Sequence, residues 1–424
     1  MPAAPEPSAP AAAAAPVTSW PHHCEVLVIG AGPAGSACAQ RLATAGIDVV
    51  LVDQHNFPRD KICGDGLIPD AHAALRTLGV YDELAALWQP ARHVRCVGPR
   101  GKHCDVPGTV SVLPRKVLDE VLVRAAQRAG AKLLTPLRFE TPLEENGRVV
   151  GARLKSGGDR THEIRAAWVV LATGAVPQAL TAAGMCERHT PSGVALRTYV
   201  RHPGLTSSIR QLQFVWHPRM RGGYGWIFPG PDGVFNIGAG HPGSHQKLKS
   251  GKGQMQELNL RRFFEAFCEV YEPARRLMSE GERLSEVKGA PLRCSLLGAR
   301  WTRPGLLVTG EAAGSTYAFS GEGIGKAMET GMLAAEALSS VQRLPAADAQ
   351  ICQRYETGLV GLKPKFDLYE RASRVNDHPW LADLVIWRAN KSARIMARMS
   401  AVIEEKQNPG WLLSFRGMRK LLTD

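Results

Sequence analysis

Short apolar runs alternate along the first half of the chain with longer segments of helical composition. Residues 24–29 and 48–52 are runs of the kind that form strands buried on both faces, and the segment between them, 36–45, has helix composition. Further buried strands are predicted at 168–172 and 306–309. Because parallel strands are joined through helical crossovers, this order predicts an α/β fold built on a largely parallel sheet.

A glycine-rich turn joins the first strand to the first helix. Residues 30–35 read G-A-G-P-A-G, and the second strand ends at Asp53. Glycines in such a turn let the backbone approach a pyrophosphate, which the positive end of the following helix also attracts, and the acid binds a ribose hydroxyl. This combination predicts a dinucleotide site made by Gly30, Gly32, Ala34, Gly35 and Asp53.

The same glycine spacing occurs a second time. Residues 238–243 read G-A-G-H-P-G and follow a strand-like segment at 234–237. The residues after them, 244–253, are polar, basic and rich in glycine, without an apolar helix or a second strand that ends in an acid. We therefore interpret 238–243 as a loop and predict no second dinucleotide domain of the ordinary kind.

The remaining pattern predicts a second layer and a helical C-terminal region. Residues 94–97 and 103–106 form a predicted hairpin, and residues 194–240 alternate strands with turns, which indicates an antiparallel sheet on the substrate side. Helices are predicted at 69–87 with a break at Gly79, at 115–130, at 258–278, at 322–340 and through most of the chain beyond 346. Short strands are predicted near 133, 139, 149–154 and 163–165. The predicted units are a disordered tail (1–23), a discontinuous nucleotide-binding domain (24–92, 109–190 and 300–340), a substrate domain (93–108 and 191–299) and a helical region (341–424).

Charge and cysteine content narrow the class of protein. Lys and Arg exceed Asp and Glu by 52 to 39, which favours an anionic partner such as a membrane surface or a phosphorylated substrate. Nucleic acid is disfavoured, because aromatic residues are few and no binding motif occurs. Nine cysteines without a C-x-x-C pair predict free thiols in a reducing cytoplasm and no metal site. No apolar run is long enough to span a bilayer, and residues 1–18 lack the basic start of a signal peptide.

Three separate segments carry a family resemblance. Residues 58–67, PRDKICGDGL, contain the pattern P-x-x-K-x-C-G and resemble the geranylgeranyl reductase family, whose members are FAD enzymes with the fold of p-hydroxybenzoate hydroxylase. Residues 224–229 (YGWIFP) and 236–240 (NIGAG) are similar to the Y-x-W-x-F-P and N-x-G-x-G blocks of that family. Residues 310–314 (GEAAG) and 321–324 (GEGI) resemble its second FAD motif. The resemblance covers about residues 24–340 and adds to the predicted fold a Rossmann-type FAD-binding domain interlocked with the antiparallel-sheet substrate domain.

The resemblance also implies a set of flavin contacts. Arg115 would bind phosphate or ribityl oxygens, the alternative being an ordinary solvated side chain, and Glu311 would reach a ribityl hydroxyl from a position where the family usually has Asp. The backbone of Gly323 and Ile324 would hold the pyrimidine edge, where the start of a helix stabilises the charge of reduced flavin. The remaining implied contacts are made by Lys61, Gly64, Asp65 and Leu67 in the loop against the flavin and by Phe139 on the adenine side.

Three side chains are candidates for the chemistry itself. The Cys63 thiol has Lys61 two positions away, which favours the thiolate; the alternative is a small packing residue. Tyr224 and Trp226 alternate with Phe228 as on a strand, so they form either a core stripe or the wall of an apolar substrate pocket.

The C-terminal segment combines basic and apolar residues. Arg388, Lys391, Arg394 and Arg398 are spaced so that one helix would carry all four on one face, and residues 411–422 are both basic and apolar. The face is either a solvated surface or a shallow membrane contact at the inner side of the cell membrane.

The resemblance implies a flavoenzyme that reduces carbon–carbon double bonds of a polyprenyl lipid, with NADPH, another external reductant or an electron-donor protein supplying electrons. A flavin-dependent monooxygenase or halogenase is the alternative, although halogenases carry W-x-W-x-I-P and this chain has only W-I-F-P at 226–229. Related hydroxylases also have Asp-Gly where this chain has Thr173-Gly174. A non-catalytic flavin protein that docks at a membrane would have no need of the intact 61–67 loop.

Overall fold

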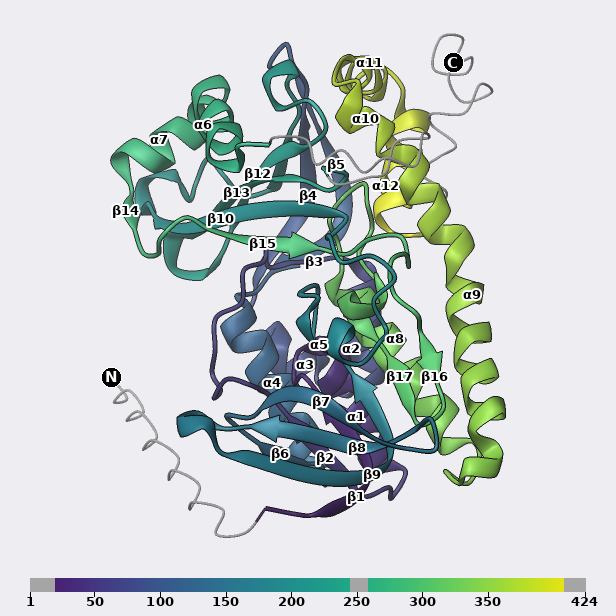
Figure 1. Ribbon diagram of the computed structural model, residues 1–424. Helices are drawn as coiled ribbons and strands as arrows, with labels where there is room; N and C mark the ends of the chain where they lie inside the picture. The colour runs from purple at the N-terminus through teal and green to yellow at the C-terminus, as the bar shows by residue number, and fades with distance from the viewer. Residues whose placement is uncertain (1–19, 245–257, 408–424) are drawn as a thin grey trace, which may run out of the picture.

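The computed structural model describes residues 20–244 and 258–407. It contains two sheets, the first mainly parallel and the second mainly antiparallel, with a helical C-terminal region that runs beside both (Figure 1). The predicted fold class is confirmed. Residues 1–19 of the predicted tail, most of the polar segment 244–253 and the whole of 411–422 lie outside the described residues.

The first sheet has the strand order β16-β17-β9-β1-β2-β6, and β1 pairs in parallel with both β2 and β9. Its apolar runs are continuous because the two faces are both covered. Val26 and Val28 pack with helical residues such as Leu42 and Leu338, while Leu27 and Ile29 pack with Leu154 and other residues of the opposite face. The strands of this sheet are β1 (His23–Ile29), β2 (Val49–Val52), β6 (Lys132–Leu134), β7 (Arg138–Glu145), β8 (Arg148–Lys155), β9 (Thr161–Leu171), β16 (Thr302–Arg303) and β17 (Leu306–Val308).

Strand β9 joins two segments that the sequence pattern separates. The predicted strands near 163–165 and at 168–172 are one continuous strand. Its first half pairs with β8 and its second half with β17, while β1 pairs along most of its length. Side chains alternate between exposed and buried in the first half and are all buried from Trp168 onward, so the apolar pattern changes where both faces of the strand become covered.

The second sheet has the order β14-β10-β13-β12-β11-β4-β5-β3, with β15 paired to β10. Along β12, Ile227 faces the helices α6 and α7, and Trp226 faces the opposite side, toward α11 and α12. This opposite side is the one that meets the first sheet's nucleotide turn. The strands are β3 (Gly66–Leu67), β4 (Gln89–Val97), β5 (His103–Val112), β10 (Gly193–Arg201), β11 (Leu212–Val215), β12 (Tyr224–Pro229), β13 (Val234–His241), β14 (Glu282–Arg283) and β15 (Lys288–Leu292).

The helices follow the predicted segments, with one additional break. The helix expected at 258–278 is divided, because Pro273 lies in the first turn of α7 and the residue between the helices, Tyr271, is extended. The helices are α1 (Pro33–Thr44), α2 (Pro69–Thr77), α3 (Tyr81–Ala85), α4 (Arg115–Arg128), α5 (Gln178–Ala182), α6 (Leu260–Val270), α7 (Glu272–Glu280), α8 (Ile324–Ser339), α9 (Asp348–Ala372), α10 (Arg374–Asp377), α11 (Trp380–Ala389) and α12 (Ala393–Ile403).

The second glycine motif is not the predicted loop. Residues 238–241 form the end of β13 and pair with β10 and β12. A Cβ atom on Gly238 would overlap the indole of Trp226, so this glycine makes room for a side chain on the neighbouring strand. The glycine spacing thus has a packing cause, which the sequence motif did not distinguish from a turn.

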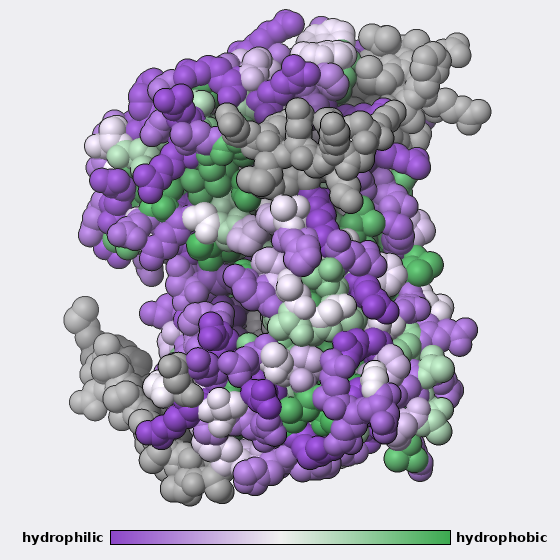
Figure 2. Space-filling view, in the orientation of Figure 1, coloured by the Kyte–Doolittle hydropathy of each residue, from purple (hydrophilic) through white to green (hydrophobic). Residues whose placement is uncertain are grey.

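The predicted basic helix face is also wrong. Helix α11 ends at Ala389, and α12 begins at Ala393 after Ser392, whose hydroxyl accepts a hydrogen bond from the Ile395 amide. Arg388 therefore lies on a different helix from Arg394 and Arg398. No helix among the described residues is long and apolar enough to cross a membrane, and the face seen in Figure 2 is mostly hydrophilic.

Candidate active site

A cavity of about 1010 Å³ lies between the two sheets. It begins at the turn between β1 and α1, passes the 59–66 loop and the start of α8, and ends among residues of α11 and α12. Nearly all the predicted site residues line it: Gly30, Gly32, Ala34, Asp53, Lys61, Cys63, Gly64, Asp65, Arg115, Phe139, Tyr224, Trp226, Glu311, Gly323 and Ile324. Gly35 and Leu67 are not among its lining residues.

The glycines of the β1–α1 turn have different tasks. Gly30 has a φ of +101°, and a Cβ on Gly35 would overlap the carbonyl oxygen of Gly30, so both are required by the backbone itself. Gly32 is extended, and a Cβ there would have ordinary contacts only, at 3.7 Å from an Arg59 nitrogen and 3.9 Å from an Arg115 nitrogen. Gly32 therefore borders a space next to two guanidinium groups, which suits a pyrophosphate.

Arg115 is buried and already has a carboxylate partner. Its Nε and one Nη donate to the two oxygens of Asp119, one helical turn later, at 2.7 and 2.8 Å. Arg59 lies 3.1 Å from the same carboxylate. The predicted fork toward phosphate is thus directed at Asp119. Arg59 also lies 3.7 Å from Asp53, so two acids balance the two arginines, and both guanidinium groups border the space beside Gly32. Neither Arg59 nor Asp119 was predicted from the sequence; the i, i+4 spacing of Arg115 and Asp119 was the available signal.

Asp53 holds the nucleotide turn on the other side of Arg59. Its Oδ2 accepts a hydrogen bond of 2.9 Å from the Ala31 amide, and its Oδ1 accepts one of the same length from the His55 amide. The carboxylate is therefore fixed at the carboxyl end of β2, where a ribose is bound in folds of this kind.

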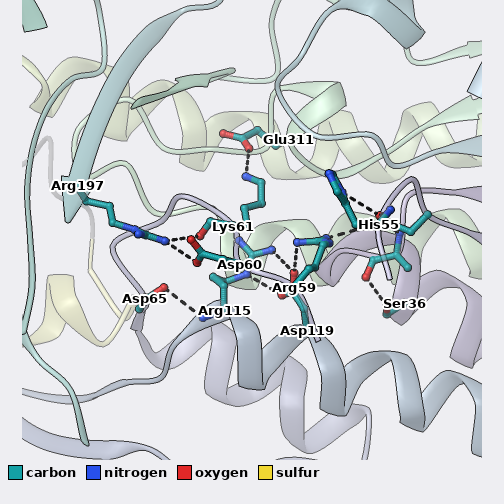
Figure 3. Close-up of polar contacts among 12 residues, drawn as sticks. Ser36, His55, Arg59, Asp60, Lys61, Asp65, Arg115, Asp119, Arg197 and Glu311 are labelled. Carbon is teal, nitrogen blue, oxygen red and sulfur yellow. Dashed lines mark hydrogen bonds and ion pairs between the residues drawn. The ribbon is translucent and has the colours of Figure 1, made fainter. Parts of the chain in front are cut away.

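The loop that follows Pro58 is connected to both sheets (Figure 3). Lys61 pairs with Glu311, which follows β17 in the sequence, at 3.4 Å between the Lys61 Nζ and the Glu311 Oε2. On the other side, one Nη of Arg197 donates to Asp60 at 2.6 Å and to the Lys61 carbonyl at 3.2 Å. The cation predicted to act on the Cys63 thiol is thus paired with Glu311. Burial opposes the charged form of Arg115, but Asp119 first and Cys63 second raise the pKa of that guanidinium, which places Cys63 beside Arg115.

Asp65 fastens the end of this loop. Its Oδ2 accepts from the Tyr199 hydroxyl at 2.5 Å and from Asn236 Nδ2 at 2.8 Å, and its Oδ1 accepts from the Arg115 amide at 3.3 Å. Burial raises its pKa to about 6, although the Tyr199 and Asn236 hydrogen bonds oppose that shift. Since three protein donors already occupy its oxygens, we propose that Asp65 positions the loop instead of binding the cofactor directly.

The aromatic stripe of β12 and the glycine block of β13 form one unit with the loop. Tyr224, Trp226 and Phe228 share one face of the strand, as their alternation predicts, and all three are buried and line the cavity. Trp226 Nε1 donates to Asn236 Oδ1 at 3.0 Å, and Asn236 in turn donates to the Cys63 carbonyl at 2.7 Å. A Cβ on Gly64 would lie 3.1 Å from the Phe228 ring, so the loop rests directly on these aromatic rings.

Beyond the aromatic stripe the cavity continues as an apolar arm between the second sheet and the C-terminal helices. Its walls come from β4, β11, α11 and α12 and from the segment before α8. Representative lining residues are Val94, Leu212, Phe214, Phe319, Ile386 and Met399. An arm of this composition favours a long hydrocarbon group.

A second polar cluster lies at the start of α8. Glu322 lines the cavity, and burial, followed by the charges of Asp70 and Glu405, raises its pKa to about 8. Lys326 lies 2.7 Å from Glu329, 3.5 Å from Glu405 and 3.6 Å from Asp70. No sequence motif indicated this cluster, because its members come from α2, α8 and the residues after α12.

Residues 23–220 match the family model of an FAD binding domain. Together with the cavity and its nucleotide turn, this match defines an FAD-dependent oxidoreductase of the p-hydroxybenzoate hydroxylase-like fold. A menaquinone reductase from Mycolicibacterium smegmatis is 33% identical over 336 residues, which span 74% of this chain and 76% of that protein. The chain belongs to the geranylgeranyl reductase family.

One further relative and two solved structures are also similar to the chain. Digeranylgeranylglycerophospholipid reductase 2 from Methanopyrus kandleri is 28% identical over 345 residues, which cover 78% of this chain and 81% of that protein. The solved structure of a geranylgeranyl bacteriochlorophyll reductase-like protein from Thermoplasma acidophilum has a TM-score of 0.70 at 21% identity, over 95% of this chain and 96% of the other. The flavin-dependent brominase Bmp2 has a TM-score of 0.68 at 17% identity, over 95% of this chain and 97% of that one, so it shares the fold.

The two glycines of the nucleotide turn should respond differently to substitution. Gly32→Val keeps an allowed backbone and should fold, but its side chain should occupy the pyrophosphate space, so the purified protein should be colourless. Gly35→Val should fail to fold, because its Cβ overlaps the Gly30 carbonyl. Circular dichroism and the flavin absorbance of the purified variants check both outcomes; a yellow, FAD-saturated Gly32→Val protein would refute the assigned position of the pyrophosphate.

Glu322 should make the stability of the protein depend on pH. Because its folded pKa is about 8, above the ordinary 4.5, the folded protein retains a proton that unfolding releases between these values. The contribution of Glu322 to stability therefore falls as pH rises from about 5 to about 8. Glu322→Gln lacks this proton, so its unfolding midpoint relative to the unsubstituted protein should rise across that range. Equal midpoint differences at pH 5 and pH 8, measured without added FAD, would contradict a protonated Glu322.

Proposed function

We propose that this protein reduces carbon–carbon double bonds in the isoprenoid chain of a polyprenyl lipid. The observation that carries the proposal is the continuity of the cavity, which joins the flavin loop at Cys63 to an apolar arm that ends at α11 and α12. The relatives named menaquinone reductase and digeranylgeranylglycerophospholipid reductase support it, because both names refer to prenylated lipids.

The residues of the nucleotide half fit FAD. Gly32 with Arg59 and Arg115 would receive the pyrophosphate, Asp53 a ribose hydroxyl and Glu311 a ribityl hydroxyl. The first turn of α8, at Gly323 and Ile324, would face the pyrimidine edge with its backbone amides and positive end. Bound FAD in its reduced form supplies a hydride equivalent, so the chain itself must place the alkene, exclude water and provide one proton.

We assign the proton to the wall of the cavity near the loop. Saturation of a double bond adds a hydride to one carbon and a proton to the other. Cys63 lines the cavity beside Arg115 and also packs against the core cluster that contains Leu67, and its carbonyl accepts a hydrogen bond from Asn236, so its position is fixed by the same contacts that fix the loop. Trp226 and Tyr224 would hold the alkene against the flavin by apolar contact.

The electron donor is an external reductant in this proposal. NADPH is one candidate and a donor protein is another. Thr173 and Gly174 line the cavity at the end of β9, without the acid that related hydroxylases have there. This difference favours a donor that does not depend on that contact.

Anaerobic reduction of the FAD-bound protein, followed by mixing with an acceptor, tests the function. A geranylgeranyl-bearing acceptor should oxidise the flavin and yield a product two hydrogens heavier, faster than air oxidises it, whereas an acceptor with a short saturated chain should not. Rapid reaction with oxygen through a hydroperoxide absorbance, without loss of a double bond, would instead support the monooxygenase or halogenase alternative.

The same assay separates a chemical role of Cys63 from a packing role. Cys63→Ala should lower the rate of flavin oxidation by the acceptor by about 10² or more, because general acid catalysis contributes factors of this size. FAD absorbance must remain at full occupancy for the comparison to be valid. A fully active, FAD-loaded Cys63→Ala protein would remove the thiol from the mechanism.

The proposal includes a peripheral contact with the inner face of the cell membrane. Trp380 and Trp387 are seven residues apart on α11, and their exposed fractions are 58% and 41%. Lys391 lies 4.9 Å and Arg388 5.3 Å from the centre of the Trp387 ring. The opposite face of α11 supplies Ala382, Val385 and Ile386 to the cavity wall, so a lipid bound there would have a short route from a membrane.

Replacing both exposed tryptophans by alanine should weaken binding to vesicles that contain anionic lipid, measured by co-sedimentation at low salt. Indole rings prefer the membrane interface, and nearby cations add to the attraction. Leu344→Ser is the matched control, because Leu344 is 56% exposed and is not part of α11. Equal binding of the double variant and the control would place the membrane contact elsewhere.

A further inference from the structure

Arg197 is a buried cation that the contacts described above satisfy only in part. It lies on β10, its side chain is 1% exposed, and it lines the cavity beside the flavin loop. One Nη donates to Asp60 and to the Lys61 carbonyl, but Nε and the other Nη have no hydrogen-bond partner among the described residues. The Arg197 guanidinium carbon lies 4.1 Å from the centre of the Tyr199 ring, but the face of a ring provides no acceptor in the plane of the guanidinium.

A second buried arginine shows what a purely structural guanidinium looks like in this protein. Arg293 is buried to the same degree, and all three of its nitrogens have acceptors: Nε bonds the Ala175 carbonyl at 3.0 Å, Nη1 the Gly298 carbonyl at 3.2 Å and Nη2 the Arg188 carbonyl at 2.9 Å. Buried ionised donors without acceptors are destabilising, and proteins rarely keep them without a cause. The difference indicates that Arg197 has a partner from outside the chain.

The position of Arg197 along the cavity identifies the kind of partner. In Figure 3 the labelled residues run from His55 at the nucleotide end, past Arg115 and Glu311, to Arg197 at the opposite end. An FAD whose ribose lies at Asp53 and whose ribityl chain lies at Glu311 would bring its ring system to the Arg197 end. The acceptor substrate must lie against the same ring.

The charge balance at this end leaves room for an anionic or carbonyl oxygen. The Asp60 side chain that pairs with Arg197 is 50% exposed, so solvent screens it, whereas the guanidinium is enclosed. Asp65 is buried nearby, but its oxygens are occupied by Tyr199, Asn236 and the Arg115 amide.

We propose that Arg197 binds an oxygen that carries negative charge at the reacting end of the cavity. The oxygen belongs either to the pyrimidine ring of the flavin, which becomes anionic on reduction, or to a polar head group of the acceptor. The second source rests on the proposed function, whereas the first requires only FAD.

The experiment measures the two-electron reduction potential of the bound flavin in Arg197→Gln, Arg197→Lys and Asp60→Asn, without acceptor. If the flavin is the partner, Arg197→Gln should lower the preference for reduced FAD at least tenfold, which is about 30 mV toward more negative potential. Arg197→Lys, which keeps the charge, should shift it less. Asp60→Asn removes the opposite charge and should shift the potential in the opposite direction.

A second measurement distinguishes the other source. With unchanged potentials, a KM at least tenfold higher in Arg197→Gln for geranylgeranyl diphosphate, but not for the uncharged hydrocarbon phytoene, would assign Arg197 to the head group. Shifts of the same sign in Arg197→Gln and Asp60→Asn, or no change in potential and KM, would overturn the proposal and leave Arg197 as a brace for the loop. Arg197→Met, which also removes the charge, gives the same decision should the glutamine variant fail to fold. Failure of the protein to reduce any prenyl acceptor would refute the proposed function but would leave the potentials interpretable.

Discussion

The structure depends on how one loop, residues 58–67, is held between the two sheets. Lys61 connects it to Glu311, which follows β17 of the first sheet. Asp60 and Asp65 connect it to Arg197, Tyr199 and Asn236 of the second sheet. Each of these contacts joins residues more than 130 positions apart. The position of the loop therefore depends on both sheets, and the loop in turn joins them where it lines the cavity.

The constraint also explains the composition around the loop. A Cβ atom would lie 3.1 Å from the Phe228 ring on Gly64 and 3.3 Å from it on Gly66, closer than an ordinary contact, and on Gly238 it would overlap the Trp226 indole. Large aromatic rings on β12 thus require small residues on both neighbouring segments. The rigid platform that results has a polar side, with Arg197 and Lys61, and an apolar side toward α11 and α12. A flavin between these two sides would separate an electron-accepting hydrocarbon from the charges that hold the cofactor.

Burial gives the polar side its electrostatic character. Asp65, Asp70 and Glu322 all have pKa values raised by burial, to about 6, 7 and 8, although arginine or lysine residues lie nearby. These carboxyl groups hold protons more tightly than surface acids do. Of the three, Glu322 lines the cavity and has the highest pKa, so it is the carboxyl group that holds a proton there near neutral pH.

The sequence by itself determined the elements whose cause is local. Continuous apolar runs identified β1, β2 and β17, because a strand covered on both faces has no polar positions, and the turn at residues 30–35 with Asp53 predicted a nucleotide site. Motifs identified the 58–67 loop and β12. Only the tertiary structure decided which charges meet. Arg115 is committed to Asp119 and Lys61 to Glu311, Arg197 and the acids around Lys326 carry no motif, and 238–241 is a strand because β10 and β12 lie beside it. The physical reason is that pairing, burial and steric room depend on neighbours that the fold brings from distant parts of the chain, and such neighbours leave no periodic signal in the sequence.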